Sequence, residues 1–273
     1  MFAAILTVAL ILTLNASAFA TEGENLDGQH DQGMTTEYYN PFGSNYSIIG
    51  TDDRKIISDT TVFPYLPISR IVTKFPCKHS VIGTGIMVSS KCMLTAGHIL
   101  VCTECGEDAT SITAYLGYKK DGTYHTAVTA NSTKNVFYHN PNYTGVGNEA
   151  IYDYGYVVFS TAVGNSTGWY GIHAPTNSEL REVPTLTVTG YSGKTLYSDS
   201  GNMYKYTSSR IYYLLDTESG ASGAPVYDKE FGYYVWAIHT HGYDNDGNAL
   251  NSGWRITSDF INELVDLGYV TRG

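Results

Sequence analysis

Basic residues are scarce in this chain of 273 residues, in which 16 Lys and Arg stand against 26 Asp and Glu and leave a net charge of −10. Residues 1–46 contain no Lys or Arg, and five acidic residues between positions 21 and 46 account for half of that net charge. Nucleic-acid binding depends on Lys and Arg that neutralise phosphates. We therefore expect no nucleic-acid partner.

A long apolar run occurs once, at residues 1–20, and it ends in the small-x-small pattern Ala18-Phe19-Ala20. This run predicts a signal peptide, although a membrane anchor is the alternative. We expect a secreted, extracellular protein with no stable membrane association after signal cleavage. The acidic residues 21–46 are too polar to form a core and indicate a pro-segment. Residues 47–273 suffice for one large domain or two small ones.

Helical periodicity is also rare. Short β-branched and aromatic runs alternate with turn residues instead, which predicts an all-β sandwich or barrel. One helix is expected at residues 258–267, capped by Thr257 or Ser258 and closed by Gly268. The seven predicted strand regions are SVIGTGIMV, ITAYLGY, YGYVVF, TLTVTGY, IYYLL, GAPVY and YYVWAIH.

Ser222 lies in the stretch TESGASGAPVY, residues 217–227, where it is either a nucleophile or part of a tight glycine-rich turn. A nucleophilic serine needs a base and a group that orients the base. His98 follows a short β run in KCMLTAGHIL, and Asp153 opens an apolar strand in AIYDYGYVVF. The chain order His98, Asp153, Ser222 is that of the chymotrypsin arrangement, and it favours a catalytic triad.

Six motifs together resemble one known family, the glutamyl endopeptidase (V8-like, Bacillus-type) branch of the trypsin-fold serine endopeptidases. The motifs are SIIGTDDR at 47–54, TAGH at 95–98, YDYG at 152–155, SGASGAPV at 219–226, IHTHG at 238–242 and NSGWRIT at 251–257. The resemblance implies two perpendicular six-stranded β-barrels with the active site between them. We place the N-terminal barrel at about 62–165 and the C-terminal barrel at about 166–256.

The resemblance also implies roles for individual residues. Ser222 would be the nucleophile, His98 the general base, and Asp153 the residue that orients it. The backbone N–H groups of Gly220 and Ser222 would form the oxyanion hole. We expect a monomer that hydrolyses protein or peptide substrates without a cofactor. A non-catalytic secreted binding protein on the same fold is the alternative class.

Two residue sets give different specificities. Asp216 lies six residues before Ser222, the spacing at which trypsin-like relatives bind Lys or Arg. The glutamyl branch instead implies that Thr217, a cationic His239 and the amine of a processed Ser47 bind a substrate carboxylate. We expect cleavage after Glu or Asp, with trypsin-like cleavage as the alternative. We expect the neighbouring His241 to be a structural core histidine.

The four cysteines depart from the family pattern, in which the disulfide positions correspond here to Gly83 and Ile99. An extended hairpin would bring Cys77 towards Cys102 or Cys105, which predicts one such disulfide in an oxidising compartment. The other cysteine is Cys92, and the four allow three complete pairings.

We expect no metal ion. A zinc site made by Cys102-x-x-Cys105 with His98 or His79 is the alternative to the disulfide. The stretch YDNDGN at 243–248 loosely resembles a calcium loop, but it lacks the distal Glu and is expected to be a hairpin turn.

Overall fold

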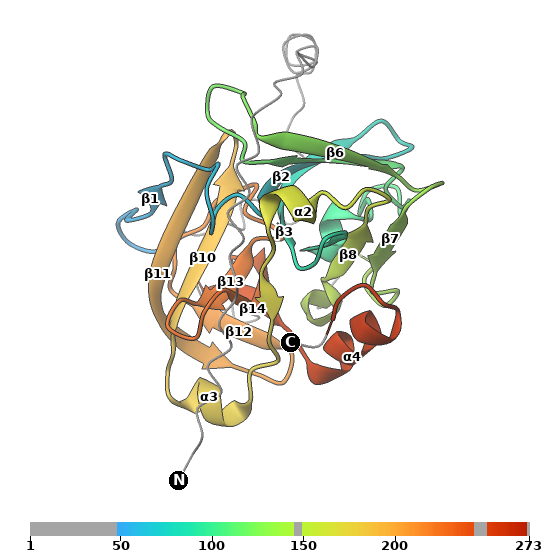
Figure 1. Cartoon of the computed structure of the whole chain (residues 1–273). Helices are drawn as coiled ribbons and strands as arrows, with labels where there is room; N and C mark the ends of the chain where they lie inside the picture. The colour runs from blue at the N-terminus through green and yellow to red at the C-terminus, as the bar shows by residue number, and fades with distance from the viewer. Residues whose placement is uncertain (1–47, 145–148, 243–249, 272–273) are drawn as a thin grey trace. The chain divides into compact units, whose positions relative to one another are not determined.

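The computed structural model describes residues 48–144, 149–242 and 250–271. The predicted signal peptide, the pro-segment, Ser47 and the YDNDGN turn lie outside these ranges. Within them, no helix combines the length and the hydropathy that crossing a bilayer requires. The described residues form two β-sheets and a C-terminal helix (Figure 1).

The N-terminal sheet has seven antiparallel strands in the order β6-β5-β2-β3-β4-β8-β7. Among the described residues no pairing joins the edge strands β6 and β7, so the sheet curls into an open half-barrel. The strands are β2 (Ile68–Lys74), β3 (Ser80–Met87), β4 (Cys92–Thr95), β5 (Ser111–Leu116), β6 (Thr126–Asn131), β7 (Val136–His139) and β8 (Gly155–Val158).

The C-terminal sheet forms a closed six-stranded barrel, because β11 pairs with both β10 and β12. The short strand β1 (Lys55–Ile56) pairs with β11, and β9 (Gly171–Ile172) runs parallel to β14. The barrel strands are β10 (Thr185–Ser192), β11 (Thr195–Tyr206), β12 (Arg210–Tyr213), β13 (Pro225–Asp228), β14 (Tyr234–His241) and β15 (Asn251–Arg255).

The predicted all-β architecture is therefore confirmed with one difference. Only the C-terminal lobe closes by strand pairing, whereas the expected six-stranded N-terminal barrel is an open sheet of seven strands within the described residues. The physical reason lies in its edges. Strand β7 has only four residues, and most side chains of β6 are partly or fully exposed, so little buried surface would hold the two edges together.

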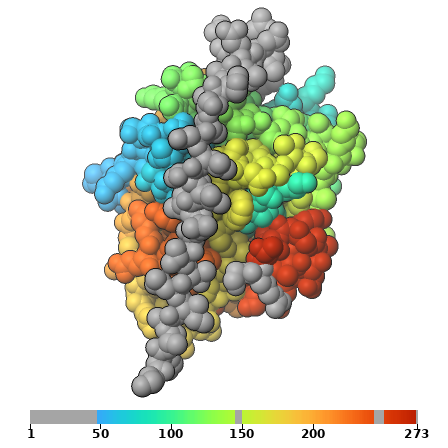
Figure 2. Space-filling view, in the orientation of Figure 1, coloured from blue at the N-terminus to red at the C-terminus, as the bar shows by residue number. Residues whose placement is uncertain are grey.

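One core cluster joins the two lobes and the C-terminal helix α4 (Ser258–Asp266). It contains Ile86 of the N-terminal sheet, Tyr227 of the barrel, and Phe260 and Leu264 of α4. The Thr257 hydroxyl accepts a hydrogen bond from the Phe260 backbone N–H at 3.2 Å and caps the helix. In Figure 2, α4 forms the red surface at the lower right, away from the blue residues that follow position 48.

The remaining helical segments are short. They are η1 (Gly97–Ile99), η2 (Glu149–Tyr152), α2 (Gly164–Thr167) and α3 (Asn177–Arg181). Two of them, η1 and η2, lie directly after β4 and shortly before β8, the paired strands from which the candidate site is built.

Candidate active site

His98 and Asp153 are brought together by the pairing of β4 with β8. These strands are antiparallel, with Thr95 opposite Gly155, so the residues just after β4 and just before β8 lie side by side. Nδ1 of His98 lies 2.7 Å from Oδ2 of Asp153. The His98 backbone N–H donates to Oδ1 of the same carboxylate at 2.9 Å. One carboxylate oxygen therefore contacts the imidazole, and the other holds the backbone of the same residue.

Asp153 is completely buried but remains ionised. Burial by itself raises the pKa of Asp153, but the charge and hydrogen bonds of His98, with a smaller contribution from His241, hold it below its ordinary value. Nδ1 of His241 lies 3.7 Å from Oδ2. An ionised Asp153 that accepts Nδ1–H of His98 favours the tautomer in which Nε2 can take a proton.

Ser222 is buried in the loop between β12 and β13, and that loop packs on the strands that lead to His98. The Thr84 N–H of β3 donates to the Ser222 carbonyl at 2.8 Å. Gly223 has a φ of +87°, and a Cβ there would lie 2.1 Å from the Thr84 carbonyl and 3.1 Å from the Ala96 backbone nitrogen. This close approach requires glycine and places the serine loop against the residues that precede His98.

One backbone N–H next to Ser222 already takes part in the turn. The Ala221 N–H donates to the Glu218 carbonyl at 3.0 Å, so it serves the turn itself. Gly220 has a φ of +96°, and its carbonyl accepts the Thr84 hydroxyl at 2.7 Å. The N–H groups proposed from the sequence, those of Gly220 and Ser222, flank Ala221.

Thr217 and His239 carry buried polar atoms that no described residue satisfies. Both side chains are buried, and neither Thr217 Oγ1 nor His239 Nε2 has a hydrogen-bond partner within the described ranges. The other ring nitrogen of His239, Nδ1, lies 2.7 Å from the Tyr213 hydroxyl. Leaving two buried polar atoms without hydrogen-bond partners costs free energy.

Comparisons with known proteins agree with this geometry, although no protein-family model matches the chain. The chain is 34% identical over 225 residues to an extracellular metalloprotease of Bacillus subtilis (strain 168), covering 80% of this chain and 68% of that protein. It is 32% identical over 232 residues to a glutamyl endopeptidase of Bacillus licheniformis, covering 81% and 68%. The chain belongs to the glutamyl endopeptidase-like, trypsin-fold serine proteases.

A solved Glu endopeptidase in complex with MPD superposes on this serine protease with a TM-score of 0.67 at 25% identity, covering 82% of this chain and 99% of that one. The trypsin-like fold is thereby confirmed, and the homology supports a serine endopeptidase that acts on peptide substrates. The name metalloprotease belongs to the Bacillus subtilis relative. Here the two groups of three possible metal ligands among the described residues include neither His98 nor Asp153.

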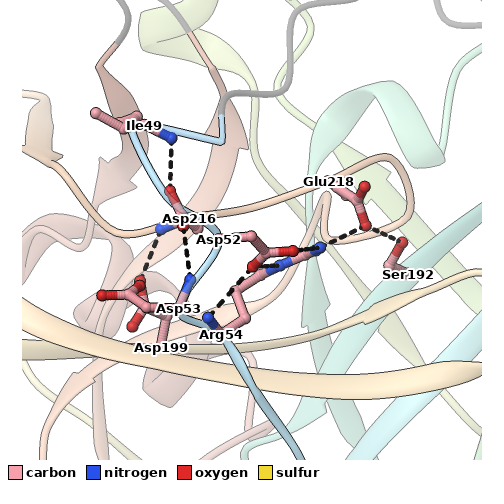
Figure 3. Close-up of polar contacts among 8 residues, drawn as sticks. All are labelled: Ile49, Asp52, Asp53, Arg54, Ser192, Asp199, Asp216 and Glu218. Carbon is pink, nitrogen blue, oxygen red and sulfur yellow. Dashed lines mark hydrogen bonds and ion pairs between the residues drawn. The ribbon is translucent and has the colours of Figure 1, made fainter.

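The carboxylate of Asp216 faces the N-terminal segment of the protease domain (Figure 3). It accepts the backbone N–H of Ile49 at 2.6 Å and that of Asp53 at 3.3 Å. The Asp216 N–H in turn donates to Asp199 at 2.8 Å. Because both oxygens already accept backbone donors, this arrangement disfavours the trypsin-like alternative, in which Asp216 would bind Lys or Arg.

Arg54 fastens the same segment to the loop that precedes Ser222 (Figure 3). Nη2 of Arg54 lies 2.8 Å from Oδ2 of Asp52 and 2.8 Å from Oε2 of Glu218. Its Cζ lies 4.4 Å from the centroid of the Tyr197 ring. Glu218 also accepts the Ser192 hydroxyl at 3.0 Å. Residues 49–54 are therefore part of the wall around the loop that carries Thr217 and Ser222.

Without a bound carboxylate, the surroundings of His239 favour the neutral imidazole. Burial, followed by the nearby Arg210 and His98, lowers its pKa to about 3. His241 behaves in the same way, and burial and Arg210 lower its pKa to about 3. The sequence pattern shows the histidines but not the burial and the neighbouring cation that set their charge.

Arg210 and Tyr213, both on β12, are site residues that the sequence reasoning missed. Arg210 is buried, and its guanidinium donates to the carbonyl of Ala150 at 2.6 Å and to the hydroxyls of Thr240 and Ser252 at 3.1 and 2.5 Å. The available signal was an arginine at the start of the aromatic strand IYYLL, because a buried arginine needs partners.

The predicted disulfide from Cys77 is not formed in the structure, where all four cysteines are free. The predicted approach nevertheless occurs, since the Cys77 sulfur lies 3.6 Å from that of Cys102 and 2.8 Å from that of Cys105. Cys92 is buried in β4, where burial raises the pKa of its thiol. His79, not His98, accompanies the cysteine cluster, with Nδ1 3.9 Å from the Cys102 sulfur.

Proposed function

We propose that this protein is a secreted serine endopeptidase that cleaves peptide bonds after Glu, and to a lesser extent Asp. The observation that carries the specificity is the pair of buried unsatisfied atoms, Thr217 Oγ1 and His239 Nε2. A substrate carboxylate accepts two or more hydrogen bonds and would satisfy both. An Arg or Lys side chain has no acceptor, so it would leave a donor on His239 unpaired and bring a cation towards Arg210.

His98 and Asp153 would activate Ser222 by the usual acyl-enzyme route. Nε2 of His98 takes the Ser222 hydroxyl proton as Oγ attacks the scissile carbonyl, and Asp153 stabilises the imidazolium through its 2.7 Å contact with Nδ1. The N–H groups of Gly220 and Ser222 bind the oxyanion, and His98 returns the proton to the leaving amine. Water then attacks the acyl-enzyme with His98 again as base, which releases the second product and restores Ser222.

Specificity would rest on neutral donors backed by a buried cation. With His239 neutral, a hydrogen bond donated by the Tyr213 hydroxyl to Nδ1 leaves the proton on Nε2, where it can be donated to a carboxylate. The Thr217 hydroxyl is a second donor. Arg210 supplies a fixed positive charge close enough to lower the pKa of His239, and the same field favours a bound anion.

The docked N-terminal segment supports processing before Ser47. Ile49 and Asp53 bond to Asp216, the residue next to Thr217. A chain that begins at Ser47 would therefore start two residues before Ile49, on the wall of the proposed specificity site. We infer that cleavage after the acidic segment 21–46 frees an amine that assists carboxylate binding. Export agrees with the signal-like residues 1–20 and with the relative named extracellular.

Cleavage-site profiling on a mixed peptide library tests this proposal. The full chain is expressed with its first 46 residues and processed, and its N-terminus is sequenced. We expect cleavage predominantly after Glu, and loss of both cleavage and fluorophosphonate labelling in Ser222→Ala. Predominant cleavage after Lys or Arg would favour the Asp216 alternative. A folded parent protein that neither cleaves nor takes up the label would favour the binding-protein alternative.

A further inference from the structure

Four side chains that the proteolytic mechanism does not use converge at the turn end of the β2–β3 hairpin. Cys77 and His79 lie in the turn between β2 and β3, and Cys102 and Cys105 lie in the loop after η1. The three sulfur atoms all lie within 4.8 Å of one another. Nδ1 of His79 is 3.9 Å from the Cys102 sulfur. Three thiols and one imidazole are a complete ligand set for structural zinc.

Backbone hydrogen bonds hold both halves of this cluster. In the first turn, the Phe75 N–H donates to the His79 carbonyl at 3.1 Å, and Lys78 has a φ of +68°. In the second loop, the Cys102 N–H donates to the Glu107 carbonyl at 2.9 Å, and the Gly106 N–H donates to the Cys102 carbonyl at 2.7 Å. The four ligands thus come from two closed turns, so binding would order little additional backbone.

The number of thiols favours a metal ion over a disulfide. A bond between any two of the three sulfurs would leave the third beside it, in position to attack the disulfide and exchange with it. Cys92 cannot supply a fourth partner, because it is buried in β4 opposite Val158. Zinc, in contrast, uses all three sulfurs and the imidazole together.

The distances fit a tetrahedral ion after small side-chain movements. With Zn–S bonds of about 2.3 Å, tetrahedral geometry separates the sulfurs by roughly 3.8 Å. The separation of Cys77 from Cys102 is 3.6 Å, and the 2.8 Å between Cys77 and Cys105 must widen. Cys105 is exposed and can move. His79 Nδ1 also lies 2.7 Å from Glu104 Oε2, a contact that ligation through Nδ1 would replace.

We propose that Cys77, His79, Cys102 and Cys105 bind one Zn²⁺ ion. Three thiols lose their protons to solvent, and the resulting complex of three thiolates, one neutral imidazole and Zn²⁺ has a net charge of −1. The ion would clamp the β2–β3 turn to the loop that follows His98. Its role is structural, and the proposal does not depend on the substrate specificity.

The test measures bound metal and thiol state in the full chain carrying Ser222→Ala, which prevents self-digestion. The protein is expressed with added zinc and purified without chelator. Zinc is measured by elemental mass spectrometry, and thiols are counted by alkylation under non-reducing conditions. We expect about one zinc per chain and no disulfide. Cys102→Ser and Cys105→Ser should each lower zinc content at least tenfold.

Two matched variants separate ligation from folding. His79→Cys changes the ligand set to four thiols and should keep the zinc, and Cys92→Val removes the cysteine outside the cluster and should also keep it. Cobalt added to the metal-free parent should give thiolate-to-cobalt absorption, which reports ligation even where a cysteine variant fails to fold. A Cys77–Cys105 disulfide with no zinc would overturn the proposal. Zinc content unchanged in both serine variants would overturn it equally.

Discussion

The hydroxyl of Tyr213 lies 2.7 Å from Nδ1 of His239, inside the C-terminal barrel. Burial raises the pKa of Tyr213 well above its ordinary value, so the hydroxyl keeps its proton and can donate it. Burial and Arg210 lower the pKa of His239 to about 3, so its ring is neutral and can accept at Nδ1. This pairing sets the tautomer with a proton on Nε2, the atom that the proposed function gives to the substrate.

Tyr213→Phe should therefore weaken cleavage after Glu more than it weakens the fold. Without the phenolic donor, the Nδ1-protonated tautomer becomes accessible, and Nε2 loses its fixed role as donor. We expect kcat/KM for a Glu peptide to fall about tenfold, equivalent to about 1.4 kcal/mol, near the upper end of the range for one hydrogen bond between neutral groups. Steady-state kinetics on Glu and Leu peptides checks this. Equal losses on both peptides would contradict the assigned role.

Acid should destabilise the folded protein before carboxylates begin to protonate. His239 and His241 have folded pKa values of about 3, below the ordinary 6.5, so the unfolded chain binds more protons between these values. Stability is therefore complete above pH 6.5 and is lost as pH falls towards 3, with a slope of up to about 2.7 kcal/mol per pH unit for two groups.

Urea unfolding of the Ser222→Ala protein between pH 7 and pH 5 measures this slope. His241→Gln removes one of the two titrating groups and should reduce the slope by about half in that interval. A stability that does not change over the interval would show that folding does not shift the pKa values of the two histidines.

Gly223→Ala should remove both activity and stability, because its Cβ would lie 2.1 Å from the Thr84 carbonyl and 2.3 Å from Thr95 Oγ1. We expect a loss of about 3 kcal/mol or more from the backbone shift that this overlap requires. Gly193→Ala is the matched control, since its φ is +57° but no atom lies within 4 Å of the added Cβ. It should cost only about 1 kcal/mol. Thermal unfolding of both variants measures the two stability losses. Similar losses would mean that the close approach of Gly223 to Thr84 does not limit stability.

Asp216→Asn should lower activity without changing which residue is cleaved. The amide accepts fewer backbone donors than the carboxylate, so the contacts from Ile49 and Asp53 weaken and the docked segment loosens. We expect kcat/KM to fall about threefold to tenfold, the value of one weakened hydrogen bond. The ratio of Glu to Arg cleavage should stay constant. A selective loss of cleavage after Arg would revive the trypsin-like alternative.

Local sequence was sufficient to find His98 and Asp153, because each lies in a short motif at a strand end. Their 2.7 Å contact follows from one antiparallel pairing, β4 with β8. Arg210 and Tyr213 could not be found in this way. They approach His239 only because β12 pairs with β15, across about 40 residues of sequence, and β15 in turn pairs with β14.

The protonation state of His239 also could not be predicted from the sequence. A histidine next to a bound carboxylate is expected to be protonated. In the ligand-free structure, complete burial and the buried guanidinium of Arg210 lower the pKa of His239 and favour the neutral ring. The open N-terminal sheet has a similar origin, since closure depends on how much surface the edge strands bury and not on the alternation within each strand.

Thr217→Val tests the specificity site without disturbing its shape, because valine replaces a hydroxyl by a methyl group. Thr217 Oγ1 has no hydrogen-bond partner among the described residues, so its removal should leave stability unchanged or higher. Thr84→Val is the control, since Thr84 Oγ1 donates to the Gly220 carbonyl and accepts the Tyr191 N–H. That variant should lose about 1–3 kcal/mol of stability because buried partners are left unsatisfied.

The most direct measurement of the central claim is the ratio of kcat/KM for matched Glu and Gln peptides in the parent enzyme and in Thr217→Val. A carboxylate gains more than an amide from a hydroxyl donor, because hydrogen bonds to charged groups are about twice as strong as neutral ones. We expect the parent enzyme to prefer Glu, and we expect the Glu-to-Gln ratio to fall about tenfold in Thr217→Val, equivalent to about 1.4 kcal/mol. An unchanged ratio in a stably folded Thr217→Val enzyme, or a parent enzyme that does not prefer Glu, would contradict the account.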